Sequence, residues 1–280
     1  MSPSKRANKA PAAAAVRWWA PPLAALQFLT RVPVRFRRAP DRAELGRSTG
    51  WFPLAGLLAG LLLLGLDWLA LKDPWQDHEA AWMFLLLLFW TWFAGSLHLD
   101  GLADTADGLA SGLRGRPMLK VMHQGSTGAF GVMALMLSLL GKWTFLACLP
   151  NQWCWFLPLP LLFSRLGMSL ACGLRPYAGE PGSLSGAFIL QSRRADRIKA
   201  SALALLGFGA LAFWAWHTHQ VPGLKVWMAL LVCLTGTALG LVATLVPLRR
   251  LGGVSGDLIG FGHEVAEVST ALGLVFLLAR

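Results

Sequence analysis

Charged residues are scarce in this sequence of 280 residues: Asp, Glu, Lys and Arg together make up 14% of it. A soluble domain usually has about a quarter. The 55% of hydrophobic residues excludes a disordered chain, and they could not all be buried in one water-soluble core. The solvent that fits this composition is a lipid bilayer.

Cysteine is also scarce, and none of the four forms a CxxC pair: they are Cys148, Cys154, Cys172 and Cys233. All lie in or beside apolar stretches. This spacing excludes a disulfide-framed secreted domain and a thiolate metal centre. We expect the four to be small, buried apolar side chains.

Long apolar runs are what the sequence has in abundance. Seven stretches are long and apolar enough to cross a membrane; they are 51–71, 80–97, 128–149, 153–173, 200–217, 226–248 and 259–279. The predicted fold class is therefore all-α, a polytopic membrane helix bundle with about seven transmembrane helices. Without a fixed-period repeat or a second domain, residues 18–280 are expected to form a single integral membrane catalytic domain.

The N-terminus differs from the rest of the chain. Residues 1–17 are rich in Ala and Lys and are predicted to be a disordered basic tail. Residues 18–38 combine Trp18 and Trp19 with four arginines, which favours an N-terminal interfacial helix, with a re-entrant helix as the alternative. Pro21 and Pro22 argue against a signal peptide.

Positive charge lies on one side of the predicted spans. Twenty of the 25 Lys and Arg residues fall in the first 50 residues and in the loops 98–127, 174–199 and 249–258, whereas Lys72, Lys225 and Arg280 fall on the other side. This bias predicts a cytoplasmic N-terminus and an external C-terminus. The net charge of +11 then reflects topology and attraction to membrane lipid, and no nucleic-acid partner is expected.

Acidic residues number only 14, and three of them, Asp100, Asp104 and Asp107, follow the second span at spacings of four and three. On a helix this places three carboxylates on one face. Such a set repels itself unless a cation lies between its members, and Mg²⁺ commonly bridges carboxylates to a substrate phosphate. The alternative is a solvated helix start favoured by the helix dipole.

A second acidic cluster begins the last span. Asp257 and Glu264 share a helical face, and Glu267 lies one turn beyond. Glu267 enters the span, and an intramembrane carboxylate is a functional candidate. The alternative is a glycine-rich connector leading into a helix.

Other polar residues stand at or within the spans. Ser126 and Gly128 precede the third span, where a helix N-terminus would offer amides to an anion, although a plain turn is the alternative. Lys142 and Arg165 lie within spans and are expected to snorkel or to pair with the carboxylates.

The segment His98-Leu-Asp100-Gly-Leu-Ala-Asp104-Thr-Ala-Asp107-Gly resembles the most distinctive motif of the cobalamin synthase family, the adenosylcobinamide-GDP ribazoletransferases of late vitamin B12 biosynthesis. Further similar stretches follow in the family's order and cover all but residues 1–20. They are 27–34, 51–56, 128–131, Lys142, 164–165, 176–178, 252–257, Glu264 and Glu267.

The resemblance implies a Mg²⁺-dependent phosphotransferase of the bacterial inner membrane, with a cytoplasmic active site. It implies adenosylcobinamide-GDP and α-ribazole, or α-ribazole 5′-phosphate, as substrates and GMP as a product. Other enzymes of B12 assembly are candidate partners.

The motif matches also suggest roles for individual residues. The candidate catalytic residues are His98, Asp104, Glu264, Lys142 and Arg165. The candidate substrate-binding residues are Arg31, Arg175, Tyr177, Asp257, Ser126 and Gly128. The candidate Mg²⁺ ligands are Asp100, Asp104, Asp107, Glu264 and Glu267.

The chain departs from the family pattern at three positions. Gln124 and Gly125 replace an acidic residue and a serine, and Gly179 replaces an arginine. These changes count against a ligand role for the loop before the third span and are compatible with altered specificity or weaker activity.

Two alternative functions remain open from the sequence. One is a CDP-alcohol phosphotransferase, but Asp104 stands where an arginine of that motif would be expected. The other is a cation-coupled transporter, which would place its site near the bilayer midplane and often has an inverted repeat.

Overall fold

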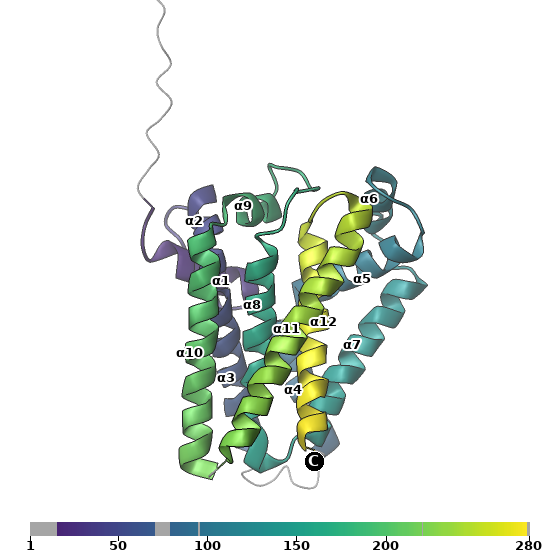
Figure 1. The fold of residues 1–280 in the computed structure, drawn as a ribbon. Coiled ribbons are helices and arrows are strands. Elements are labelled where there is room, and N and C mark those ends of the chain that lie inside the picture. The colour runs from purple at the N-terminus through teal and green to yellow at the C-terminus, as the bar shows by residue number, and fades with distance from the viewer. Residues whose placement is uncertain (1–15, 71–78, 95, 220, 279–280) are drawn as a thin grey trace, which may run out of the picture.

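The computed structural model describes residues 16–70, 79–94, 96–219 and 221–278, and over these residues the chain is helical (Figure 1). In chain order the helices are α1 (Ala20–Leu29), α2 (Arg42–Ser48), η1 (Thr49–Trp51), α3 (Phe52–Ala70), α4 (Glu79–Ala94), α5 (Ser96–Ala110), α6 (Arg116–Met122), α7 (Ala129–Cys148), η3 (Asn151–Phe156), α8 (Pro158–Ala171), α9 (Leu184–Gln191), α10 (Arg194–His219), α11 (Gly223–Leu251) and α12 (Gly256–Leu278). The all-α prediction is confirmed. Residues 1–15 of the predicted tail lie outside the described residues.

Six described segments are long and apolar enough to cross a membrane, and they contain α3, α7, α8, α10, α11 and α12. A seventh span is possible only if α4 and α5 are taken together, and their axes differ by 83°. The structure thus has six or seven spans, which agrees with the predicted number of about seven. The second predicted span, however, needs a correction. The predicted span 80–97 ends with α4 at Ala94, and the following Asp- and Gly-containing residues form the separate helix α5.

The core of the bundle is α8, which packs against α3, α10, α11 and α12. Inside the fold, 89% of its span is buried, against 33% for α7, α10 and α11. Glycine allows the closest approaches: a Cβ at Gly56 would clash with the backbone of Leu161, and one at Gly240 with the backbone of Gly262. Small residues of this kind let membrane helices pack closely.

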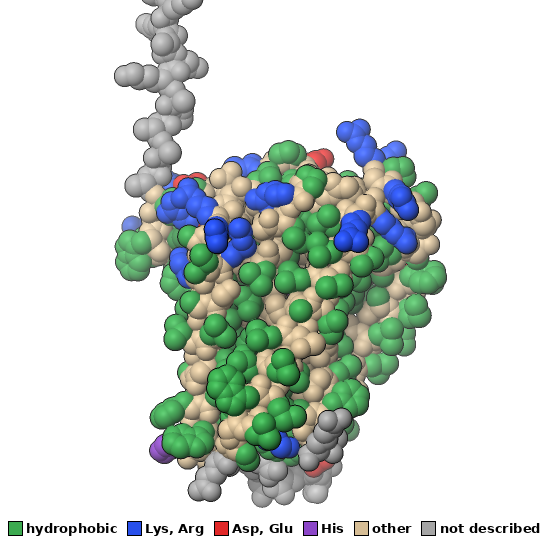
Figure 2. All heavy atoms as spheres, in the orientation of Figure 1, with side chains coloured by type: hydrophobic (Ala, Val, Ile, Leu, Met, Phe, Trp, Pro, Cys, Tyr) green, Lys and Arg blue, Asp and Glu red, His purple; other side chains and the backbone are tan. Residues whose placement is uncertain are grey.

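The sides of the bundle are apolar, as Figure 2 shows on one face. Leu137 of α7, Leu206 of α10 and Leu231 of α11 are 63%, 69% and 66% exposed. Side chains of this type on a polytopic bundle are suited to contact with lipid. The prediction of four buried cysteines is wrong for Cys148, which is exposed, and for the half-buried Cys154. Both lie near the end of a span rather than at its centre.

Lysine and arginine gather at one end of the molecule, which we call the basic end; it carries α2, α6 and α9 (Figures 1 and 2). The predicted N-terminal helix is α1, which at ten residues is too short to span and packs on α2 and α3. The preceding Arg17 pairs with the buried Glu44 of α2 at 2.7 Å. This ion pair fixes the entry of the chain into the bundle.

Candidate functional site

Three carboxylates converge where α5 meets the start of α12; we call Asp100, Asp104 and Asp257 the aspartate cluster. The two helices touch at Gly101, where a Cβ would lie 2.8 Å from the carbonyl oxygen of Asp257. His123, which follows α6, lies with its Nε2 3.5 Å from the Asp257 carboxylate. Residues distant in the sequence thus form one acidic site at the basic end.

The carboxylates of the aspartate cluster affect one another. The pKa of Asp104 is raised to about 6, first by partial burial and then by the negative charges of Asp100 and Asp257. His123 acts in the opposite direction. Because mutual repulsion opposes full ionisation, a cation placed between these oxygens would relieve it. The donor set is of the kind that hard divalent cations prefer.

The third motif aspartate, Asp107, has a different environment. Its carboxylate oxygens accept hydrogen bonds from the backbone amides of Gly128 at 2.6 Å and Gly131 at 2.8 Å. The start of α7 is thus an anion-binding helix terminus, as the sequence suggested, and the anion it binds is the protein's own Asp107. Ser126 is exposed in the turn before α7.

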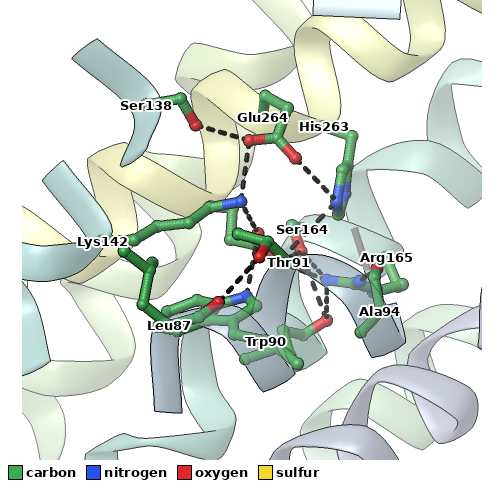
Figure 3. A network of polar contacts seen from close by, with 12 residues as sticks. Leu87, Trp90, Thr91, Ala94, Ser138, Lys142, Ser164, Arg165, His263 and Glu264 are labelled. Carbon is green, nitrogen blue, oxygen red and sulfur yellow. Dashed lines mark hydrogen bonds and ion pairs between the residues drawn. The ribbon is translucent and has the colours of Figure 1, made fainter. Parts of the chain in front are cut away.

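A second group of charges is buried inside the bundle; we call Lys142, Arg165, Glu264 and Glu267 the buried charge network (Figure 3). The Nζ of Lys142 lies 2.8 Å from Glu264 and 2.7 Å from Glu267, and Arg165 pairs with Glu267. At most 1% of each of these four side chains is exposed. The expected pairing of the intramembrane cations with carboxylates is confirmed.

Neutral side chains complete the buried charge network. Ser138 donates a hydrogen bond to Glu264 at 2.6 Å, and the Trp90 indole donates one to Glu267 at 3.1 Å. Ligand atoms of His263, Glu264 and Glu267 lie within 4.8 Å of one another, a spacing that a metal could bridge. However, two cations already balance the two carboxylates, and a divalent ion there would add uncompensated positive charge.

A pair of histidines lies beside the buried charge network. The rings of His98 on α5 and His263 on α12 lie 4.2 Å apart in an edge-to-face arrangement. Both side chains are buried, and the Nε2 of His263 is 3.7 Å from Glu267. His98 also lines two cavities at the basic end. The predicted catalytic residues are therefore neighbours but form two layers, with the aspartate cluster at the surface.

The remaining predicted substrate-binding residues are dispersed. Arg175 donates to the carbonyls of Cys172, Leu174 and Ile189, so its guanidinium is engaged by the protein itself. Arg31 donates to the Ser96 hydroxyl at 2.9 Å and lines a cavity.

Tyr177 is tied to the site through its hydroxyl. The hydroxyl lies within 2.8 Å of Ser183 and 3.0 Å of Ser185. A β-bridge to Val254 holds the tyrosine segment beside the start of α12. Tyr177 is thereby placed next to Asp257 in the wall of one cavity.

Two cavities meet at the aspartate cluster. The first, which we call the aromatic cavity, has a volume of about 340 Å³ and is lined by Phe28, Phe52, Phe188 and also Asp100. The second, which we call the cationic cavity, has a volume of about 880 Å³. Its lining includes Arg116, Lys120 and His123.

Four residues line both of these cavities: Ser183, Ser185, Gly256 and Asp257. A third cavity, of about 510 Å³, contains Arg31 and shares His98 and Asp100 with the aromatic cavity.

Sequence reasoning missed several residues of this region. Arg116 and Lys120 of α6 were counted only as part of the cytoplasmic charge, and His123, next to the departures at Gln124 and Gly125, was given no role. His263 lay inside the second acidic cluster without a role. The available signal was position for Lys120, His123 and His263, which lie within a few residues of Gln124 or Glu264.

The family model described as cobalamin-5-phosphate synthase matches residues 21–275. The chain is 35% identical to the adenosylcobinamide-GDP ribazoletransferase of Ectopseudomonas mendocina, with 92% of this chain and 99% of the relative covered. It is 36% identical to the enzyme of that name from Pseudomonas fluorescens, with 89% and 96% covered.

A more distant relative of the same name, from Chlorobium chlorochromatii, is 30% identical, with 91% of this chain and 95% of the relative covered. No solved structure matches the chain. The match to the family model spans every residue of the aspartate cluster and of the buried charge network. The chain is a member of the cobalamin-5-phosphate synthase family.

Proposed function

We propose that the protein is an adenosylcobinamide-GDP ribazoletransferase that joins adenosylcobinamide-GDP to α-ribazole or its 5′-phosphate. A ribose hydroxyl oxygen forms a bond to the phosphorus that carries the cobinamide, and the bond from that phosphorus to the bridging oxygen of GMP breaks. The products are a cobamide phosphodiester, GMP and the hydroxyl proton. The relatives of this name support the reaction over a CDP-alcohol transferase or a transporter.

The observation that carries this proposal is the aspartate cluster at the junction of two cavities. Phosphoryl transfer depends mainly on positioning and charge neutralisation. Asp100 and Asp104 offer only carboxylate oxygens, which fits Mg²⁺. When bound there, the ion would neutralise charge on the diphosphate. The third carboxylate of the cluster, Asp257, is left for proton transfer. We assign no metal to Glu264 and Glu267, since Lys142 and Arg165 already neutralise them.

The proton of the attacking hydroxyl needs an acceptor within the site. Asp257 is the carboxylate best placed for this role, because it lines both the aromatic cavity and the cationic cavity. His123 lies 3.5 Å from the same carboxylate and can relay the proton to solvent. Asp257 is therefore proposed as the general base.

We further propose that the basic end faces the cytoplasm across a bacterial inner membrane. The Lys and Arg bias supports this orientation. The C-terminus is then periplasmic, since α12 runs from the basic end to the opposite end (Figure 1). An alkaline phosphatase fused after Arg280 is expected to be active, and an inactive fusion in correctly inserted protein would contradict this orientation.

The function is tested by purified protein in lipid nanodiscs. With Mg²⁺, adenosylcobinamide-GDP and α-ribazole, we expect equal amounts of GMP and cobamide product. The Asp104→Asn variant should lose at least about 100-fold in rate, since it removes a charge from the metal site. The matched control is Glu79→Gln at the exposed start of α4, at the other end of the bundle, and it should retain full activity. Absence of product from folded wild-type protein would refute the proposal.

A further inference from the structure

The aromatic cavity and the cationic cavity differ in chemistry although they share a wall. Three phenylalanines line the aromatic cavity, and none of the described residues lining it is Lys or Arg. The cationic cavity is larger and carries the side chains of Arg116, Lys120 and His123, with the carboxylates of Asp257 and Glu180 also in its lining. One is suited to a flat apolar group and the other to an anionic group.

The cations that the sequence suggested for phosphate are not free to bind it. Lys142 and Arg165 are held by Glu264 and Glu267, and Arg175 is held by backbone carbonyls. Arg116 and Lys120 are exposed on α6 and face the same cavity as Asp257. Among the described residues, the Lys and Arg side chains that line a cavity together with Asp257 therefore come from α6. Arg31 lines the third cavity beside Asp100, and its guanidinium donates to Ser96 and to the carbonyl of Trp92.

The wall that the two cavities share marks the position where the reacting phosphorus would lie. In phosphoryl transfer the attacking and leaving oxygens lie roughly in line, on opposite sides of the phosphorus. Two ligands, one in each cavity, would meet at the residues that both cavities share, among them Asp257.

We infer that the cationic cavity binds the guanosine nucleotide half of the donor, through Arg116 and Lys120, while the aromatic cavity binds the aromatic base of the acceptor nucleoside. The inference rests on the proposed function and adds to it which part of the site holds which substrate. The bulky corrinoid then remains outside both cavities.

The cationic side is tested by Arg116→Ala, Lys120→Ala and the double variant. Each lost charge-assisted contact to phosphate should weaken binding about tenfold or more. In the double variant, the KM for the donor and the inhibition constant of GMP should rise at least about 100-fold, with the KM for α-ribazole unchanged. Arg114→Ala is the matched control, because Arg114 is exposed on the same segment and does not line the cavity. An unchanged donor KM in the double variant would overturn the inference.

The two-cavity arrangement is tested on the wild-type protein with two inhibitors. Benzimidazole, a probe for the aromatic base, should compete with α-ribazole and not with the donor, and GMP should show the reverse. Both inhibitors should bind at once. Lines of inverse rate against the concentration of one inhibitor, each measured at a different fixed concentration of the other, should therefore intersect. Parallel lines, which indicate mutually exclusive binding, would overturn the inference.

Equilibrium binding of radiolabelled GMP separates this inference from the reaction itself. If wild-type protein binds GMP and the double variant does not, the cationic cavity is a nucleotide site even when no cobamide product forms. If product forms but GMP binding is equal in both proteins, the proposed function stands and the cavity assignment falls.

Discussion

Replacing Lys142 by methionine removes one cation from the centre of the buried charge network with little change in volume. Its Nζ contacts Glu264 at 2.8 Å and Glu267 at 2.7 Å, and all three side chains are fully buried. After the change, Glu267 keeps Arg165. Among the residues that the structure describes, Glu264 keeps only the Ser138 hydroxyl as a hydrogen-bond donor. The network then carries an uncompensated negative charge.

Breaking a buried ion pair in this way costs about 3–5 kcal/mol. At about 2–4 °C for each kcal/mol, the Tm of Lys142→Met in detergent should fall by about 10 °C. The double variant Lys142→Met/Glu264→Gln restores charge balance and should recover about 2 kcal/mol of that loss. Circular dichroism during heating measures both. A loss below about 1 kcal/mol for the single variant, or additive losses in the double variant, would refute this account of the network.

Three further predictions concern the surface layer of the site. Asp107→Asn should lower the free energy of unfolding by about 1 kcal/mol, since the Asp107 carboxylate caps α7. It should leave the Mg²⁺ concentration for half-maximal rate unchanged. A shift as large as that of Asp104→Asn would make Asp107 a metal ligand. Gly101→Val should lower the rate about 100-fold with helix content retained, because the valine Cβ would push on the backbone of Asp257. Wild-type kinetics in this variant would show that close contact between α5 and α12 is not required for activity. Arg175→Ala should lower the Tm and leave both KM values unchanged, whereas a raised KM would give Arg175 a direct role in binding.

The spans were predictable from the sequence because hydropathy alone determines which segments enter lipid. The predicted 128–149 and 259–279 correspond to α7 (Ala129–Cys148) and α12 (Gly256–Leu278). The turn between α4 and α5 was not predictable, since an apolar window carries no information about the direction of the chain beyond it. Placing His98 and the aspartates on a separate helix required the structure.

The candidate site was predictable as a set of residues but not as an arrangement. Spacing correctly grouped Asp100, Asp104 and Asp107 on one helix. It could not show that Asp107 caps α7, because its partners lie more than twenty residues away. It also could not separate Asp257 from Glu264, which share α12 but belong to different layers. Asp257 lies in the first turn of α12 against Gly101, whereas Glu264 lies about two turns further along, paired with the buried Lys142.

The central claim is that the cobinamide-linked phosphorus is transferred to the acceptor at the aspartate cluster. The most direct test uses adenosylcobinamide-GDP labelled with ³²P at that phosphorus in a single turnover with α-ribazole and Mg²⁺. The account predicts that all of the label appears in the cobamide product and that the released GMP is unlabelled. Label in a released guanosine nucleotide would contradict it, because the bond between that phosphorus and the bridging oxygen of GMP would then have stayed intact.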